Sequence, residues 1–381
     1  MTSDPYLESR HRDLAQRVRA FGESHLRSGA GDEGDLVGRT RELALRLADS
    51  GFLTYAVPPP NGAMDLRSLV VVRENLAYFS SLADTTFIMQ GLGSHPLALA
   101  GTEIQKRRWL PAITRGEILA AFAVTEPEAG SDVAALRTSA QREGNLWRLT
   151  GVKTLISNAG IAGMYTVLAR SDKRDEQDAL SMFLVDAQSP GISVKPLELM
   201  APHPIGELRF TGTPALLLGE LGKGYALALA TLDTFRASVG AAAVGLAQRA
   251  FDEAVRHALA RRQFGRPLCE FQGVQMAIAE MHAELQAARL LVRHAAWTRD
   301  QGQERLTLEG STAKLFATEM AQRVVDRALQ IHGGQGVLKG ATVERLYREV
   351  RALRIYEGTT EVNKLVIAGQ TYAAFASDDE A

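Results

Sequence analysis

Residues 121–132 read AFAVTEPEAGSD, and the character of the sequence changes at this stretch. Before it, apolar residues recur at helical spacing throughout residues 1–120. After it, short runs rich in β-branched and aromatic residues are separated by turn residues, as far as a glycine-rich segment at 219–224. The stretch therefore joins an N-terminal helical domain to a middle β domain that we place at 121–221.

The middle domain carries short candidate strands with no helical segment between them. This pattern predicts a compact antiparallel barrel or sandwich. The predicted strands are 147–150, 153–157, 165–170, 180–185, 192–196 and 207–210.

Helical periodicity returns after residue 224 and continues almost to the end of the chain. Long helices rich in Ala, Leu and Arg predict an antiparallel four-helix bundle. The predicted helices are 225–260, 268–301, 307–332, 342–350 and 360–375. The expected fold is thus α+β and mainly α, with domains at 1–120, 121–221 and 222–381.

Composition excludes several classes of protein. Among 381 residues, 43 are Lys or Arg and 44 are Asp or Glu, so the basic excess typical of nucleic-acid binding is missing. The single cysteine, Cys269, cannot form an intramolecular disulfide or a cysteine-based metal site, and we predict no metal. The charged N-terminus and the short apolar runs predict a soluble, cytoplasmic protein with no membrane partner.

Common nucleotide and hydrolase motifs are absent. The sequence at 333–336, GGQG, lacks the further glycine of a dinucleotide fingerprint, and no P-loop or Gly-x-Ser-x-Gly elbow occurs. Two segments stand out instead: 121–132, which could be a linker with a turn, and 354–361, RIYEGTTE. Glu357 precedes a helix start near Thr359, and by spacing alone it is either a solvated surface carboxylate or a catalytic one.

Together these segments resemble the acyl-CoA dehydrogenase family, whose middle-domain signature is Thr-Glu-Pro-x-Ala-Gly-Ser-Asp. The resemblance extends over roughly residues 75–370, with motifs in the family's order, and implies the same α, β, α plan. The matching stretches are GTEIQK at 101–106, LP at 110–111, KTLISN at 153–158, RRQFG at 261–265, FQ at 271–272, QIHGG at 330–334 and YEGT at 356–359.

The resemblance implies FAD-dependent α,β-dehydrogenation of an acyl thioester. Glu357 is then the base that abstracts the α-proton, and flavin N5 accepts the β-hydride. A dry pocket raises the pKa of such a carboxylate. Tyr356 and Gly358 are implied as substrate contacts, because they flank the base.

The resemblance also implies flavin contacts in two regions. In the middle domain these are Phe122, Val124, Thr125, Ser131, Leu155 and Ser157. In the C-terminal domain they are Arg261, Phe264, Gln272, Gln330, Gly333, Gly334, Thr359 and Glu361. Since the family's arginine motif and glycine pair reach a neighbouring subunit's flavin, a homotetramer or homodimer is implied.

Ser131 and Arg236 match positions that contact the CoA part of the substrate in relatives. Two departures from the family pattern are visible. Leu155 stands where relatives usually carry Trp, and MAPHPI at 200–205 replaces the usual Arg-x-Ser loop. We read His203 in this loop as a surface histidine.

Three functions remain open at this point. The first is dehydrogenation of a thioester carried on CoA or on an acyl carrier protein, with an electron-transfer flavoprotein as a further partner. The second is a flavin oxidase or monooxygenase of the same fold that uses O2. The third is a catalytically silent assembly protein that kept the flavin fold.

Overall fold

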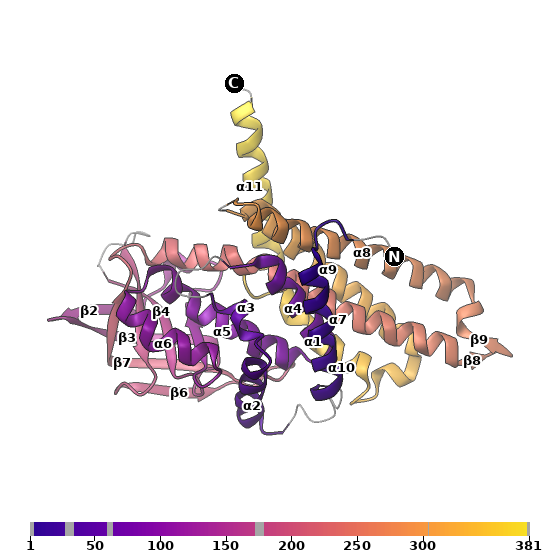
Figure 1. Ribbon diagram of the computed structural model, residues 1–381, viewed down its shortest axis with the longest axis horizontal. Coiled ribbons are helices and arrows are strands. Elements are labelled where there is room, and N and C mark those ends of the chain that lie inside the picture. Colours follow the sequence, from indigo (N-terminus) through magenta and orange to yellow (C-terminus); the bar gives the residue numbers. More distant parts are fainter. Residues whose placement is uncertain (1–3, 27–33, 59–63, 172–178, 304, 379–381) are drawn as a thin grey trace. The chain divides into compact units, whose positions relative to one another are not determined.

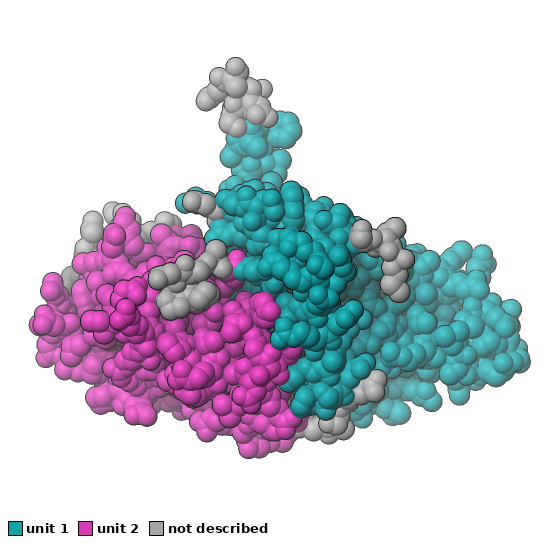
Figure 2. All heavy atoms as spheres, in the orientation of Figure 1, with its two compact units in different colours: residues 1–31, 65–84, 233–381 teal, residues 32–64, 85–232 magenta. Residues whose placement is uncertain are grey.

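The computed structural model describes residues 4–26, 34–58, 64–171, 179–303 and 305–378. The chain divides into two compact units, each discontinuous in sequence (Figure 2). Unit 1 comprises Met1–Gly31, Asp65–Asp84 and Asp233–Ala381, and unit 2 comprises Asp32–Met64 and Thr85–Leu232. The boundaries proposed from the sequence, at residues 121 and 222, stay a prediction.

Helices dominate unit 1, and α9 is central to its packing. It contacts α8, α10 and α11, while α4 contacts α1 and α8 (Figure 1). The core side of α9 repeats every three or four residues through Ala313, Ala317, Ala321 and Val324. The helices of unit 1 are α1 (Ser9–His25), α4 (Leu66–Phe79), α8 (Gln272–Asp300), α9 (Thr307–His332), α10 (Thr342–Arg351) and α11 (Thr360–Asp378).

The predicted C-terminal helices match these elements to within a few residues. The largest difference is the start of α8 at Gln272 instead of 268, because Leu268–Glu270 form a short 3-10 turn, η3. Further 3-10 turns are η4 (Gly333–Val337) and η5 (Ala352–Arg354), and a small hairpin pairs β8 (Arg262–Gln263) with β9 (Arg266–Pro267).

Unit 2 contains α2 (Leu36–Asp49), α3 (Leu53–Ala56), α6 (Glu103–Thr114) and η1 (Val133–Ala135) around a seven-stranded sheet. Two helices, α5 (Ser81–Ala100) and α7 (Gly224–Ala260), run through the sequence boundary between the units. Among the described helices, α7 alone is long and apolar enough to cross a membrane, and 72% of its most apolar window is buried inside the protein.

The sheet closes on itself into a barrel. Its order is β1-β4-β2-β3-β7-β5, β5 pairs again with β4, and β6 pairs with β7. The pairs are antiparallel except those of β4 with β1 and with β2. The strands are β1 (Ala120–Ala123), β2 (Ser139–Glu143), β3 (Leu146–Ser157), β4 (Met164–Arg170), β5 (Leu180–Asp186), β6 (Ile192–Pro196) and β7 (Ile205–Leu218).

Both faces of β4 and β5 are buried, which explains their nearly continuous apolar sequences. Alternate residues enter two different cores. Met164 and Leu168 pack in a cluster with Trp109 of α6, whereas Tyr165 and Val167 pack with aromatic residues contributed by other strands.

Two predicted strands, 147–150 and 153–157, are one long strand, β3. The register against β7 shifts between Leu149 and Thr150 and again between Lys153 and Ile156. Leu155, at the second shift, has a left-handed φ of 56°. Bulges of this kind bend a strand without ending it, so the interrupted sequence pattern still forms one element.

A buried ion pair fixes the segment after β1 to β3. Lys153 Nζ donates to the Val124 carbonyl at 2.8 Å and to Glu126 Oε1 at 2.7 Å. The Glu126 carboxylate also accepts the N–H groups of Arg137 and Thr138. Burial lowers the pKa of Lys153 to about 8, although Glu126 acts to raise it.

We expect Lys153→Met to lower the free energy of unfolding by about 3–5 kcal/mol, because it leaves the Glu126 carboxylate buried without its cation. Urea unfolding followed by tryptophan fluorescence measures the loss. The control is Arg115→Met, which breaks the exposed ion pair of Arg115 with Glu117 and is expected to cost less than about 1 kcal/mol. Equal losses in the two variants would contradict the assigned role of Lys153.

Candidate active site

The predicted site residues divide between the two units. Unit 2 holds those of the middle segment, namely Phe122, Val124, Thr125, Ser131, Leu155 and Ser157. Unit 1 holds the remainder, namely Arg236, Arg261, Phe264, Gln272, Gln330, Gly333, Gly334, Tyr356, Glu357, Gly358, Thr359 and Glu361.

Glu357 lies in a tight turn between η5 and α11. Both Glu357 (φ 54°) and Gly358 (φ 96°) adopt left-handed backbone conformations, which are unfavourable for a side chain such as Glu. The Thr359 hydroxyl accepts the N–H of Val362 at 3.2 Å and so caps the start of α11. The turn therefore presents Glu357 immediately before a fixed helix end.

Two buried side chains hold this turn in place. Lys314 of α9 donates from Nζ to the Gly358 carbonyl at 2.5 Å. Asn363 of α11 donates from Nδ2 to the carbonyls of Gly358 and Thr359, both at 2.9 Å. Because Lys314 and Asn363 are almost fully buried, the backbone next to Glu357 is fixed from both sides.

The Glu357 carboxylate lies where burial and positive charge oppose each other. Its Oε2 atom is buried and has no hydrogen-bond partner in the described part of the chain. Desolvation raises the pKa of Glu357, although the charges of Arg73, Lys314 and Arg236 lower it. Burial likewise lowers the pKa of Lys314 to about 8. A carboxylate is suited to accept a proton when its pKa is raised and one of its oxygens accepts no hydrogen bond from the described residues.

A second buried network adjoins Tyr356. Arg73 of α4 donates from Nε and Nη2 to the two oxygens of Asp84, at 2.9 and 2.8 Å, and from Nη1 to Ser238 Oγ at 2.9 Å. Tyr356 is 40% exposed, but protein surrounds its hydroxyl, and this desolvation raises its pKa despite the hydrogen bond with Arg73. The network thus fixes the residue that precedes Glu357.

Arg236, predicted as a CoA contact, is buried in unit 1 close enough to lower the pKa of Glu357. Its Nη1 donates to Ser311 Oγ at 3.2 Å, and its Nε atom has no partner among the residues that the structure describes. Arg236, Tyr356, Glu357 and Gly358 are therefore brought together.

In unit 2, Leu155 lies in the bulge near the end of β3, and Ser157 is the last residue of that strand. Leu155 is 54% exposed, whereas the Ser157 hydroxyl lies 3.0 Å from Nε2 of His203. Thr125 is half-buried. Unlike Thr125 and Ser157, Ser131 is exposed.

The remaining predicted flavin contacts lie on open parts of unit 1. Phe264, at the tip of the β8–β9 hairpin, is 92% exposed with φ 49°. A Cβ atom added at Gly333 or Gly334 would meet nothing within 4 Å, so a ligand can approach this backbone closely. The other exposed contacts are Arg261, Gln272, Gln330 and Glu361.

This donor set fits FAD. A flavin ring needs polar partners such as the hydroxyls of Thr125 and Ser157, and a diphosphate needs a guanidinium such as that of Arg261. The uncovered glycine backbone at 333–334 fits close approach by a nucleotide.

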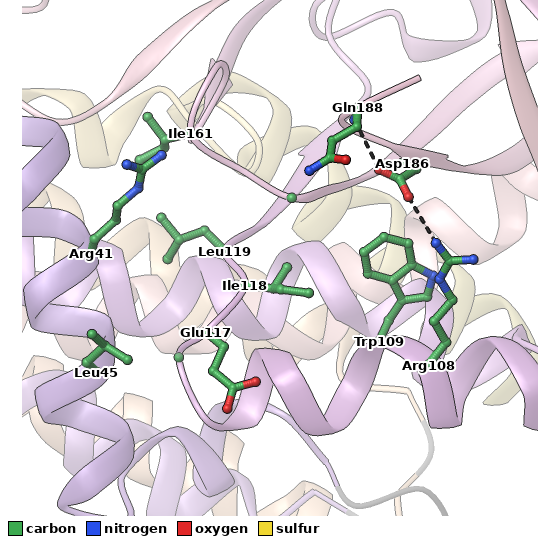
Figure 3. A pocket seen from close by; sticks show the side chains of 12 residues that line it. Arg41, Leu45, Arg108, Trp109, Glu117, Ile118, Leu119, Ile161, Asp186 and Gln188 are labelled. Atoms are coloured by element: carbon green, nitrogen blue, oxygen red, sulfur yellow. Dashed lines mark hydrogen bonds and ion pairs between the residues drawn. The ribbon is translucent and has the colours of Figure 1, made fainter. Parts of the chain in front are cut away.

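A separate hollow of about 710 Å³ opens in unit 2 between the start of β1, α2 and α6. Figure 3 shows Trp109 and Glu117 at its wall and Arg108 paired with Asp186, which lies 3.1 Å away. Its lining contains none of the predicted site residues. The hollow is therefore distinct from the residues to which the sequence points.

Several residues of the site were missed by sequence reasoning, namely Arg73, Asp84, Lys314 and Asn363. Lys314 and Arg73 fall on the apolar stripes of α9 and α4, and a charge at a core position was the available signal. The interpretation of His203 as a surface histidine is wrong, because the ring is half-buried against Ser157.

Models of three domains match almost the entire chain. They are the N-terminal domain of acyl-CoA dehydrogenase at residues 8–117, the middle domain at 121–213 and the C-terminal domain at 222–371.

Characterised relatives and solved structures agree with this result. The chain is 38% identical to 3-(aryl)acrylate reductase of Clostridium sporogenes, covering 95% of this chain and 98% of the relative. It is 37% identical to cyclohexane-1-carbonyl-CoA dehydrogenase of Geobacter metallireducens, covering 88% and 89%. The glutaryl-CoA complex of glutaryl-coenzyme A dehydrogenase matches with a TM-score of 0.93 at 31% identity, covering 98% and 97%.

Butyryl-CoA dehydrogenase from Megasphaera elsdenii matches with a TM-score of 0.89 at 32% identity, covering 98% of this chain and all of that chain. The predicted fold class and the predicted FAD cofactor are confirmed. The chain belongs to the acyl-CoA dehydrogenase family and is an FAD-dependent oxidoreductase that acts on the CH–CH bond of acyl-CoA.

Proposed function

We propose that the protein oxidises an acyl thioester between Cα and Cβ, with Glu357 as the base that removes the α-proton. The observation that carries this proposal is the Glu357 carboxylate itself. One of its oxygens is buried and has no hydrogen-bond partner among the described residues, and its backbone is anchored through Gly358 by Lys314 and Asn363.

The surroundings of Glu357 suit a base, because both the ionised and the protonated form of its carboxyl group are accessible. Desolvation makes the carboxylate more basic than an exposed one, while Arg73, Lys314 and Arg236 keep its ionised form accessible. When bound, the flavin supplies the two-electron acceptor for the hydride that leaves Cβ. The Glu357 N–H is proposed to bind the thioester oxygen and stabilise its developing negative charge.

We assign the flavin ring to Phe122, Val124, Thr125, Leu155 and Ser157 of unit 2. We assign the parts of FAD between the ring and the nucleotide end to Arg261, Phe264, Gln272 and Thr359. Gln330, Gly333, Gly334 and Glu361 are assigned to the nucleotide end. Exposed apolar side chains support assembly into a homodimer or homotetramer, because lone monomers rarely expose such surface. They are Phe264 and, on α11, Leu365, Tyr372 and Phe375.

The thioester handle is proposed to be coenzyme A, contacted by Ser131 and Arg236. The relatives that act on cyclohexane-1-carbonyl-CoA and on aryl acrylates favour a cyclic or aryl acyl group over a straight chain. The name of another relative, the CarC subunit of the caffeyl-CoA reductase–Etf complex of Acetobacterium woodii, 34% identical, supports an electron-transfer flavoprotein as redox partner.

Anaerobic titration of the FAD-loaded protein with cyclic, aryl and straight-chain acyl-CoA, and with acyl-carrier thioesters, tests the proposal. We expect the visible flavin bands to bleach with at least one thioester. In Glu357→Gln the bleaching rate is expected to fall by about 10²–10⁴-fold, because the base is lost.

Glu280→Gln, which changes an exposed glutamate of α8, should bleach like the unmodified protein. Bleaching at an undiminished rate in Glu357→Gln would contradict the assignment of the base. A flavin that no thioester bleaches, but that consumes O2 when reduced, would favour the oxidase alternative that exposed Leu155 leaves open.

Lys314→Met should move the acid limb of the pH–rate profile to higher pH by about one unit. Below pH 8 Lys314 carries a positive charge that lowers the pKa of Glu357, so its removal leaves more of the base protonated. Turnover of the best thioester between pH 5.5 and 8 measures the shift.

Lys314→Arg keeps the charge and should restore most of the acid limb. Lys195→Met, which changes an exposed lysine of β6, should leave the limb unmoved. A limb displaced to lower pH in Lys314→Met would contradict the electrostatic account.

A further inference from the structure

The loop at 200–205 is attached to the end of β3 at a defined register. The N–H of Asn158 donates to the Pro204 carbonyl at 2.8 Å, and Ser157 pairs with Ile205 of β7. Asn158 is itself held through Nδ2, which donates to the Ala120 carbonyl at 3.0 Å. The two residues that directly follow His203 are therefore fixed to the end of β3, which places His203 next to Ser157.

The contact between these two side chains has a definite direction. Nε2 of His203 lies 3.0 Å from the Ser157 hydroxyl, and a backbone hydrogen bond with Ala201 acts to raise the pKa of the ring, as an accepting carbonyl does. A carbonyl can only accept, so the ring nitrogen that it faces carries the proton. Burial lowers the pKa of His203 to about 4, so the ring is neutral at pH 7. Nε2 is then left as the acceptor of the Ser157 proton.

We propose that His203 is a positioning residue: by accepting the hydrogen bond from Ser157, it turns the lone pairs of the serine oxygen towards the flavin. This inference rests on the proposed function, in which Ser157 is assigned to the flavin ring, and it further takes the Ser157 hydroxyl to lie beside flavin N5. It concerns only the orientation of one hydroxyl group, and no bond is made or broken.

The orientation changes which redox state of the cofactor is favoured. A hydroxyl that offers lone pairs can accept from the N–H of a reduced flavin but cannot donate to an oxidised one. One net hydrogen bond is worth about a tenfold change in an equilibrium. For a two-electron couple, a tenfold change corresponds to about 30 mV. His203 is therefore expected to raise the flavin reduction potential.

The test is a double-mutant cycle of His203→Phe and Ser157→Ala in the FAD-loaded protein, read as the reduction potential against indicator dyes without substrate. We expect His203→Phe to lower the potential by about 30 mV and to have no effect when Ser157 is already Ala. His203→Gln, whose amide oxygen can accept, should recover part of the potential and also serves if the Phe variant folds poorly. An equal shift in both backgrounds, or none, would overturn the proposal.

A second readout needs neither flavin nor activity. In cofactor-free protein labelled with ¹⁵N-histidine, His203 should show the neutral form protonated at Nδ1 at pH 7, and Ser157→Ala should move its Nε2 resonance. An Nε2-protonated or charged ring overturns the inference. If thioesters fail to bleach the flavin while the dye potentials shift as expected, the proposed function falls and the role of His203 stands. If a thioester bleaches the flavin but the dye potentials do not shift, the proposed function stands and the role of His203 falls.

Discussion

A buried ammonium group needs hydrogen-bond acceptors close to it. In each unit one buried lysine finds a backbone carbonyl of a turn as its acceptor, and this contact fixes the turn. Lys314 donates to the Gly358 carbonyl, and Lys153 donates to the Val124 carbonyl and to Glu126. Leaving either charge unpaired would cost several kcal/mol. Conformations of the turn that move the carbonyl away from the lysine are therefore strongly disfavoured. The residues next to the turns, Glu357 and Thr125, are those proposed for chemistry.

Burial also acts on the proposed base, Glu357. Removing the carboxylate from water raises its pKa, and three neighbouring cations limit that rise. The cations alone would lower the pKa of Glu357 and make it a weaker base, and burial alone would raise its pKa further than the cations allow. The balance therefore depends on Arg73, Lys314 and Arg236 as much as on Glu357.

The helices were predictable because their apolar residues recur with the helical period, and α9 begins and ends where the pattern does. The strands were harder to predict. β1, with the sequence AAFA, lacks β-branched residues, and β3 was divided in two because Gly151 and the bulge at Leu155 interrupt the alternation. In the site, the motif around Glu357 was identified by resemblance. Partners that depend on tertiary packing, such as Asn363 and His203, gave no signal in the local sequence.

The left-handed backbone at Glu357 has an evolutionary consequence. Replacement by glycine would relieve both the strained φ angle and the burial of a carboxylate, and with Glu357 as the proposed base it would produce a more stable, inactive protein. Mutational drift at this position is thus directed towards loss of activity. With the proposed role of Glu357, only selection for turnover would keep a glutamate at this strained position.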